Sequence, residues 1–281
     1  MPEHVRKVKD RAYTKQEIRT LLDAANTRVR ALILLFVSTG MRAGAVPGLR
    51  LKHLTKMHDD DSGCYKISLY DEDVGKQVTV FTTIECTQAI DAYLKYREVK
   101  GEVLKPESPL IRKEFSHRDA NKFEPVSRAT VARLIEEVAL RTGLRAKSGG
   151  KRQQVMLVHG LRKYFDTNLG RANIKTLFIP ILRGHSSPGL QSSYFRPTEE
   201  EIYAEYKKAV DILTISEEKH LRYQVERLKT EIADMDLMKK NYLEMKLEIE
   251  KRDRQIQDLY TILYQRGMIK KEFSSAPPSS H

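Results

Sequence analysis

The chain has 281 residues, too many for a peptide-sized binding module and enough for one catalytic domain of roughly 200 residues plus an appendage. Hydrophobic residues make up 40% and charged residues 31%, which excludes intrinsic disorder over the whole length. Fifty Lys and Arg oppose 38 Asp and Glu. The net charge of +12 therefore predicts a polyanionic partner, because each phosphate that binds Lys or Arg releases counterions.

The cysteines, the first residues and the apolar runs of the chain bear on whether the protein is secreted, embedded in a membrane or cytoplasmic. Cys64 and Cys86 are too few for a disulfide framework and lack the spacing of a zinc site. The first ten residues are charged throughout, and the longest apolar run, Ala31–Val37, is far too short to span a bilayer. We therefore expect a protein of the reducing cytoplasm, neither secreted nor embedded in a membrane.

The N-terminal part predicts two helices followed by a hairpin. Thr14 and Glu17 form a capping-box pattern that begins the first helix, and the apolar run that begins at Ala31 predicts a buried second helix that ends at Gly40. Residues 64–70 and 76–83 are rich in β-forming side chains and flank an acidic turn that contains glycine. This pattern is typical of a β-hairpin in a small sheet.

Helical periodicity returns after the hairpin. Residues 83–98 predict a helix, the proline-punctuated stretch 101–121 predicts a loop, and residues 127–143 predict a helix that Ser127 caps. Residues 145–154 form a strongly basic loop that leads into the stretch VMLVHGLRKYF.

The last third of the chain carries a heptad pattern. Apolar or aromatic residues recur every seven positions and predict a long helix or a coiled coil. The spacing to the residues between them shortens from four to three near Met235, a break that locally overwinds a supercoil. The heptad residues are Leu221, Leu228, Met235, Tyr242, Ile249, Ile256 and Leu263, and the residues between them are Val225, Ile232, Met238, Met245 and Leu259.

A few polar residues at the predicted helix ends could carry chemistry, whereas no glycine-rich phosphate motif or metal-binding motif is present. Arg42 follows the buried second helix, and His159 and Arg162 lie three residues apart on one helical face. His185 precedes Tyr194 by nine residues across a turn. Arginines can fork onto phosphate oxygens and a phenol can attack phosphorus, so the set has the parts for metal-free phosphoryl transfer.

The order of these motifs resembles the tyrosine recombinase, or phage integrase, family over roughly residues 12–213. The matching features are TGMR, a hairpin lysine, HGLR, GH and a tyrosine nine residues after that histidine. The stretch SSYFRPTEEEIYAEYKKA is most similar to archaeal members. The resemblance implies DNA strand cleavage and rejoining through a 3′-phosphotyrosine intermediate, with neither a metal, nor ATP, nor any other cofactor.

The resemblance also implies roles for single residues. Arg42 and Arg162 would clamp the scissile phosphate, and Tyr194 would attack it. Three further residues would act beside them: Lys76 would protonate the leaving 5′ oxygen, His159 would exchange the nucleophile's proton and His185 would bond a phosphate oxygen. Two choices stay open, because Lys66 lies in the same hairpin as Lys76, and Tyr203 and Tyr206 compete with Tyr194 on the next amphipathic stretch.

Further cations predict contacts to the DNA backbone, with plain solubility as the alternative. Such contacts would position the protein without reading sequence. The predicted residues are Arg50, Lys52, Arg145, Lys147, Lys151, Arg152 and Lys163.

The fold class expected from these patterns is α+β: a mainly helical catalytic domain with a small antiparallel β-sheet, followed by a long C-terminal helix or coiled coil. We expect the catalytic domain at residues 1–213, the heptad segment at 214–264 and a disordered tail at 265–281. Members of this family usually carry a helical DNA-clamping domain before the segment that here starts near Arg11. We expect either that DNA encirclement is weaker or supplied elsewhere, or that this chain is a fragment of a longer gene product.

The leading functional hypothesis is a site-specific recombinase of the integrase or excisionase type. The expected partners are double-stranded DNA attachment sites and further copies of the chain, from dimer to tetramer on DNA, with residues 221–263 as a candidate contact and no membrane. DNA binding would place the protein at the nucleoid. The alternatives are type IB topoisomerase-like nicking and closing, and a DNA-binding scaffold that acts through its coiled coil.

Overall fold

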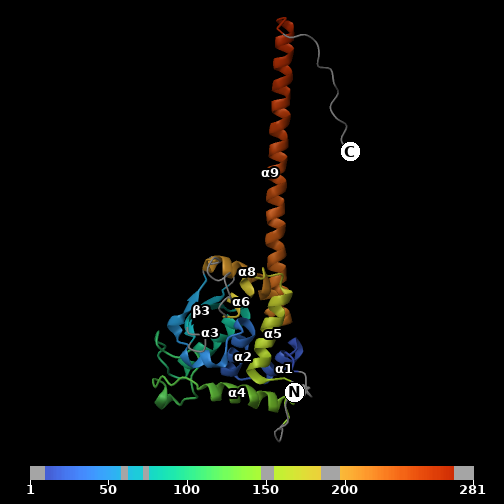
Figure 1. Cartoon of the computed structure of the whole chain (residues 1–281). Coiled ribbons are helices and arrows are strands. Elements are labelled where there is room, and N and C mark those ends of the chain that lie inside the picture. Colours follow the sequence, from blue (N-terminus) through green and yellow to red (C-terminus); the bar gives the residue numbers. More distant parts are fainter. Residues whose placement is uncertain (1–9, 58–62, 72–75, 147–154, 185–196, 269–281) are drawn as a thin grey trace. The chain divides into compact units, whose positions relative to one another are not determined.

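The computed structural model describes residues 10–57, 63–71, 76–146, 155–184 and 197–268. The chain divides into two compact units, Met1–Tyr223 and Gln224–His281. The first unit combines a three-stranded antiparallel sheet with helices, which hold most of the residues that the structure describes in this unit (Figure 1). The mainly helical α+β class predicted from the sequence is therefore confirmed.

Helices α1 (Lys15–Ala24) and α2 (Thr27–Thr39) begin at defined caps. Thr14 and Glu17 form the predicted capping box of α1. Helix α2 begins earlier than its apolar run, because the Asn26 side chain accepts a hydrogen bond from the Val29 backbone N–H at 2.9 Å. Every residue from Ala31 to Thr39 is buried, so α2 lies at the centre of the core.

The sheet has the order β1-β2-β3, with β1 at Leu54–Lys56, β2 at Tyr65–Asp71 and β3 at Lys76–Phe81. Strands β2 and β3 form the predicted hairpin, with Ile67 opposite Val80. Strand β1 has no counterpart among the predicted elements, since three residues are too few to show an alternating pattern. Helix α3 (Ile84–Val99) follows and packs extensively against α2.

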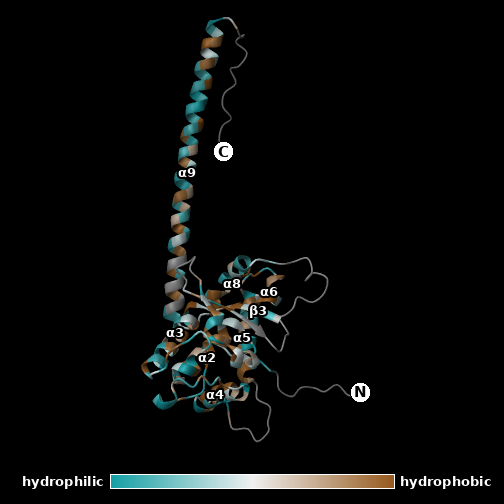
Figure 2. Cartoon of the chain, turned by 90° about the vertical axis from the view of Figure 1, so that its left-hand side faces the viewer, coloured by the Kyte–Doolittle hydropathy of each residue, from teal (hydrophilic) through white to brown (hydrophobic). Residues whose placement is uncertain are grey.

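Further along the described part of the first unit, the chain forms α4 (Arg128–Arg141), α5 (Leu157–Arg171), α6 (Phe178–Leu182) and α8 (Glu199–Leu213). Short 3-10 helices occur at η1 (Ala43–Gly48), η2 (Leu51–His53) and η3 (His117–Asp119). In both whole-chain views α4 lies at the opposite end of the unit from α8, with α2 between them (Figures 1 and 2). The C-terminal end of α2, strand β3 and the N-terminal half of α5 contribute residues to one pocket.

A buried ion network stabilises the long loop between α3 and α4. Glu102 accepts hydrogen bonds from Arg97 at 2.8 and 2.5 Å and from Arg112 at 2.7 Å, and all three side chains are 0–2% exposed. Arg112 also donates to the carbonyl oxygens of Ala120 and Lys122. Burial raises the pKa of Glu102, but the hydrogen bonds from the two guanidinium groups outweigh it and hold that pKa below its ordinary value.

The junction between α8 and the long helix α9 (Glu217–Gln265) lies in the first unit, where other residues of that unit hold it by hydrogen bonds. The buried Glu85 carboxylate accepts from the backbone N–H of Ile215 at 2.7 Å and of Ser216 at 3.2 Å. Arg19 donates to the Ile215 carbonyl at 3.2 Å and pairs with Glu217 at 2.9 Å. Within the described ranges, no helix combines the length and apolar character that a bilayer span requires.

Candidate functional site

Gly40 sets the direction of the chain that carries Arg42. Its backbone adopts the left-handed conformation at φ +59°, and a Cβ there would lie 2.1 Å from the Phe165 ring. Glycine therefore meets two requirements at this C-cap: a positive φ and a close approach of α5. The turn after it leaves Arg42 half-buried at the start of η1, beside the pocket.

Arg162 is held in place by two backbone carbonyls. Its guanidinium donates from Nη1 to the carbonyl oxygen of Gly40 and from Nη2 to that of Arg183 at 3.0 Å. These bonds join α5 to the ends of α2 and α6, elements that are far apart in the sequence. Because the planar fork is fixed on both sides, Arg162 is positioned before any ligand arrives.

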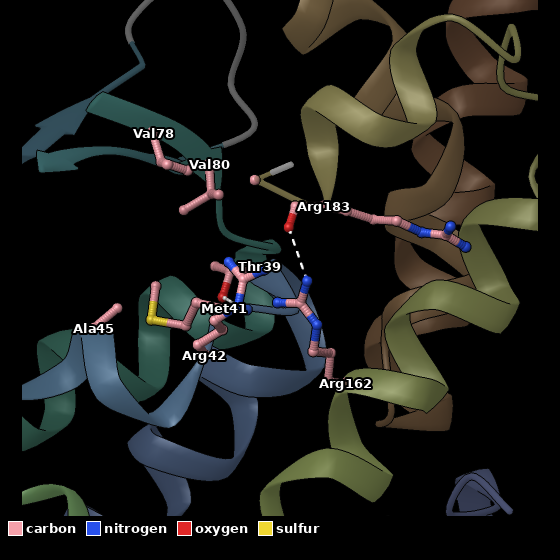
Figure 3. Close-up of a pocket in the computed structure, with 9 residues that line it drawn as sticks. Thr39, Met41, Arg42, Ala45, Val78, Val80, Arg162 and Arg183 are labelled. Carbon is pink, nitrogen blue, oxygen red and sulfur yellow. Dashed lines mark hydrogen bonds between the residues drawn. The ribbon is translucent and has the colours of Figure 1, made fainter. Parts of the chain in front are cut away.

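Arg42 and Arg162 line the same pocket. Figure 3 shows the Arg162 guanidinium pointing from α5 toward Arg42, while the Arg183 side chain points away from both. Arg183 instead contacts Asp166, with Nε and Oδ1 3.0 Å apart. The described residues that line it are Thr39, Met41, Arg42, Ala45, Val78, Val80, Arg162, Arg183 and Gly184. Two guanidinium groups at one small pocket suit an anionic group such as a phosphate.

Gly160 allows the HGLR turn to pack against the N-terminal part of the unit. A Cβ at this position would lie 2.7 Å from Val155 Cγ1 and 2.9 Å from Cε2 of Tyr13. Tyr13 is only 5% exposed, so its ring cannot move aside easily. The close contact fixes the first turn of α5, which carries the exposed His159 as its third residue.

We expect Gly160→Ala to lower the free energy of unfolding by about 1–3 kcal/mol, because overpacking forces neighbouring side chains from their preferred positions. The matched control is Gly170→Ala on the same helix, where no atom lies within 4 Å of an added Cβ. That variant should match or exceed the wild-type stability, since alanine favours helix over glycine. Urea unfolding of both variants measures the difference. Equal stability of the two would contradict the packing role of Gly160.

The β2-β3 hairpin carries both candidate lysines. The Lys66 ammonium is bonded to Glu199 at 2.7 Å and is thereby tied to the first residue of α8. Lys76 is the first residue of β3 and stands opposite Asp71 in the register. The side chain of Lys76 lies outside the described residues, so its predicted catalytic role stays a prediction.

The tyrosines of α8 have packing roles. Tyr203 is 6% and Tyr206 is 1% exposed, and both contact Phe81, with ring centroids 5.0 and 5.6 Å apart. The Tyr206 hydroxyl donates to the Ser38 carbonyl at 2.9 Å, and burial raises its pKa well above the ordinary value. The Tyr206 hydroxyl is therefore not suited to attack a large substrate. The predicted His185 and Tyr194 lie outside the described residues.

The cations predicted to contact DNA bond within the chain wherever the structure describes them. Lys52 pairs with Glu107 at 2.8 Å, Arg145 with Glu136 at 2.9 Å and Lys163 with Asp10 at 2.8 Å. Arg50 donates to the carbonyl oxygens of Pro47 and Leu49 at 2.7 and 3.1 Å. Lys147, Lys151 and Arg152 lie outside the described residues. The predicted DNA contacts of all seven stay predictions.

Sequence reasoning missed the residues that complete the pocket. The Arg183 carbonyl positions Arg162, and a Cβ on Gly184, at φ +66°, would lie 3.0 Å from Val78. The sequence signals for these two residues were their place directly before His185 and, for Gly184, its part in the GH motif. Within the described ranges, no three His, Cys, Asp or Glu residues lie together as a metal site would require.

A family model described as the phage integrase family matches residues 11–201 of this chain. A comparison with curated proteins found no match.

Several solved structures are similar to this chain. A crystal structure of XerA recombinase is 21% identical, with 72% of this chain and 66% of that chain covered and a TM-score of 0.48. The integrase from mycobacterium phage Brujita is 17% identical, with 74% and 60% covered and a TM-score of 0.49. A lambda integrase tetramer bound to a Holliday junction is 22% identical, with 70% and 51% covered and a TM-score of 0.46. The match thus spans between about half and two thirds of these chains.

Proposed function

This chain belongs to the phage integrase family, and on that premise we propose that it is a site-specific DNA recombinase that cuts and rejoins strands through a 3′-phosphotyrosine. The observation that carries the proposal is the meeting of Arg42 and Arg162 at one pocket, although 120 residues separate them in the sequence. Two positioned guanidinium groups neutralise the charge that a phosphodiester gains as it becomes pentavalent.

The proposed reaction is a balanced transesterification. The Tyr194 oxygen forms a bond to phosphorus while the bond to the 5′ oxygen breaks, and the bond energy is kept in the protein–DNA link. His159 takes the phenol proton and Lys76 gives a proton to the leaving oxygen. His185 bonds a phosphate oxygen of the transition state. Religation is the reverse reaction, in which a 5′ hydroxyl attacks the phosphotyrosine. The proposed steps therefore consume no nucleotide and need no metal ion.

Two contacts support the choice among the candidate residues. Lys66 is engaged by Glu199, which favours Lys76 as the proton donor. Tyr203 and Tyr206 are buried against Phe81, which favours Tyr194 as the nucleophile.

We propose double-stranded attachment sites as the substrate and a dimer or tetramer on DNA as the working form. The basic residues predicted above would exchange their internal partners for backbone phosphates, and the protein would act in the cytoplasm and at the nucleoid. We propose residues 1–213 as the catalytic domain, 214–264 as the heptad helix and 265–281 as the tail.

Supercoiled plasmids that carry the DNA flanking this chain's own gene test the proposal. A recombinase is expected to exchange strands between two such sites, so that deletion or inversion products appear on a gel. Relaxation without exchange would indicate nicking and closing alone. Unaltered plasmid together with plain DNA binding would support the scaffold alternative and overturn the proposal.

A further inference from the structure

Helix α9 exposes a stripe of apolar residues, interrupted at Arg252, which we call the α9 seam. From Val225 to Leu259 its side chains are 49–74% exposed. Figure 2 shows hydrophobic and hydrophilic residues alternating along the helix. Exposed apolar stripes of this length mark contact surfaces in proteins. The seam consists of Val225, Leu228, Ile232, Met235, Met238, Tyr242, Met245, Ile249, Ile256 and Leu259.

The types of residue along the seam select a packing mode. In the heptad notation abcdefg, Val225 and Ile232 occupy a positions and Leu228 occupies the d position between them. After the spacing break, Ile249 and Ile256 again occupy a positions. In parallel coiled coils, β-branched residues at a with leucine at d favour two strands over three or four, because these shapes fit the knobs-into-holes packing of a dimer.

Charge argues for a second copy of this chain rather than DNA as the occupant. Residues 224–265 carry eight Lys or Arg and nine Asp or Glu, so this stretch has a net charge of −1 while the whole chain has +12. A nearly neutral helix neither attracts a phosphate backbone nor repels its own copy. The seam offers on the order of 1,000 Å² of apolar surface per chain, whereas a standard interface buries about 800 Å² per partner.

We propose that two copies of this chain pair through the α9 seam as a parallel, in-register, two-stranded coiled coil, and that they do so without DNA. In a parallel pair, both catalytic units are attached to the same end of the coiled coil. A pair of active sites is then delivered to DNA together, as strand exchange requires. The pairing itself is independent of the proposed chemistry, so each can fail without the other.

Arg252 provides an internal marker of this register. It occupies a d position between Ile249 and Ile256, and in the single chain it pairs with Glu248 at 2.8 Å. Parallel, in-register pairing sets the two Arg252 side chains opposite each other, and a polar core position lowers stability while it fixes the register. Arg252→Leu is therefore expected to lower the dimer dissociation constant at least tenfold, whereas Arg254→Leu on the outer face leaves it nearly unchanged. Sedimentation equilibrium measures both.

Cysteine cross-linking of the full chain tests direction and register. Leu228→Cys and Leu259→Cys each place a thiol at a d position, and parallel pairing sets each thiol against its own copy. Oxidation without DNA should give disulfide-linked dimers of both variants. The matched controls, Thr230→Cys and Thr261→Cys, lie two residues further on the outer face and should stay monomeric on a denaturing gel. The native Cys64 and Cys86 are buried, and the wild-type chain reports any contribution from them.

Three outcomes would overturn the proposal. A monomeric mass by light scattering at 50 µM chain would exclude pairing, and a tetrameric mass would exclude two strands. Cross-linking of Leu228→Cys only when mixed with a cysteine variant near the other end of α9 would show an antiparallel pair. If the protein forms this dimer but does not recombine the plasmids, the pairing through α9 stands and only the proposed recombinase activity is contradicted.

Discussion

Arg162→Ala is expected to lower the rate of DNA cleavage at least about 100-fold, since removing one positioned donor from a developing phosphoryl charge typically costs 10²–10³ in rate. The guanidinium is fixed by the carbonyl oxygens of Gly40 and Arg183, so its loss removes a preorganised group rather than a mobile one. Arg162→Lys keeps the charge but loses the fork that bonds both carbonyls, and we expect it to stay well below the wild-type rate.

Single-turnover cleavage of a plasmid that carries the attachment site measures these rates. The matched control is Arg171→Ala, which removes an exposed arginine from the end of the same helix and should leave the rate within about twofold of wild type. Thermal unfolding of each variant shows whether a lower cleavage rate comes from the missing side chain or from loss of the folded structure. A folded Arg162→Ala protein that cleaves at the wild-type rate would remove Arg162 from the mechanism.

Glu102→Gln is expected to lower the free energy of unfolding by about 3–5 kcal/mol, because it leaves two buried guanidinium groups without a counter-charge. The side chains of Arg97 and Arg112 are 0 and 2% exposed, so water cannot replace the lost carboxylate. Glutamine has nearly the same volume as glutamate, so a lower stability of this variant reports the lost charge and not a change in packing.

The control for this prediction is Glu137→Gln, which breaks the exposed pair with Arg133 at 2.7 Å and should cost less than about 1 kcal/mol. The chain contains no tryptophan, so near-ultraviolet circular dichroism of its tyrosines can follow urea unfolding of both variants. If Glu102→Gln costs no more than Glu137→Gln, the network does not stabilise the fold.

Local signals predicted the parts of the fold that depend on near neighbours. The Thr14–Glu17 capping box and the end of α2 at Gly40 are confirmed, because caps and left-handed glycines act within a few residues. The Arg97–Glu102–Arg112 network could not be predicted this way. Its bonds form across a loop whose path depends on the packed core, and neither spacing nor charge pattern distinguishes these arginines from exposed ones.

The candidate site shows the same division between local and long-range information. The order of the motifs assigned Arg42 and Arg162 to one site, and both residues line the same pocket, while their catalytic roles stay predictions. The hydrogen bond from Arg162 to the Arg183 carbonyl could not be predicted from the sequence, because every residue has a backbone carbonyl and the pattern of side chains does not show which one accepts. Counting cations could not show that Lys52 and Lys163 pair with carboxylates inside the chain, because such pairs join residues distant in sequence.

Mapping the residue that becomes linked to DNA identifies the nucleophile of the proposed reaction. Wild-type protein is mixed with DNA that carries a nick beside the scissile phosphate, so that the cut fragment diffuses away and the adduct accumulates, and peptide mass spectrometry then locates the link. We expect a 3′-phosphate linked to Tyr194, and we expect this link to be lost in Tyr194→Phe and kept in Tyr203→Phe. A link on any other residue, or an adduct that persists in Tyr194→Phe, would contradict the proposed role of Tyr194.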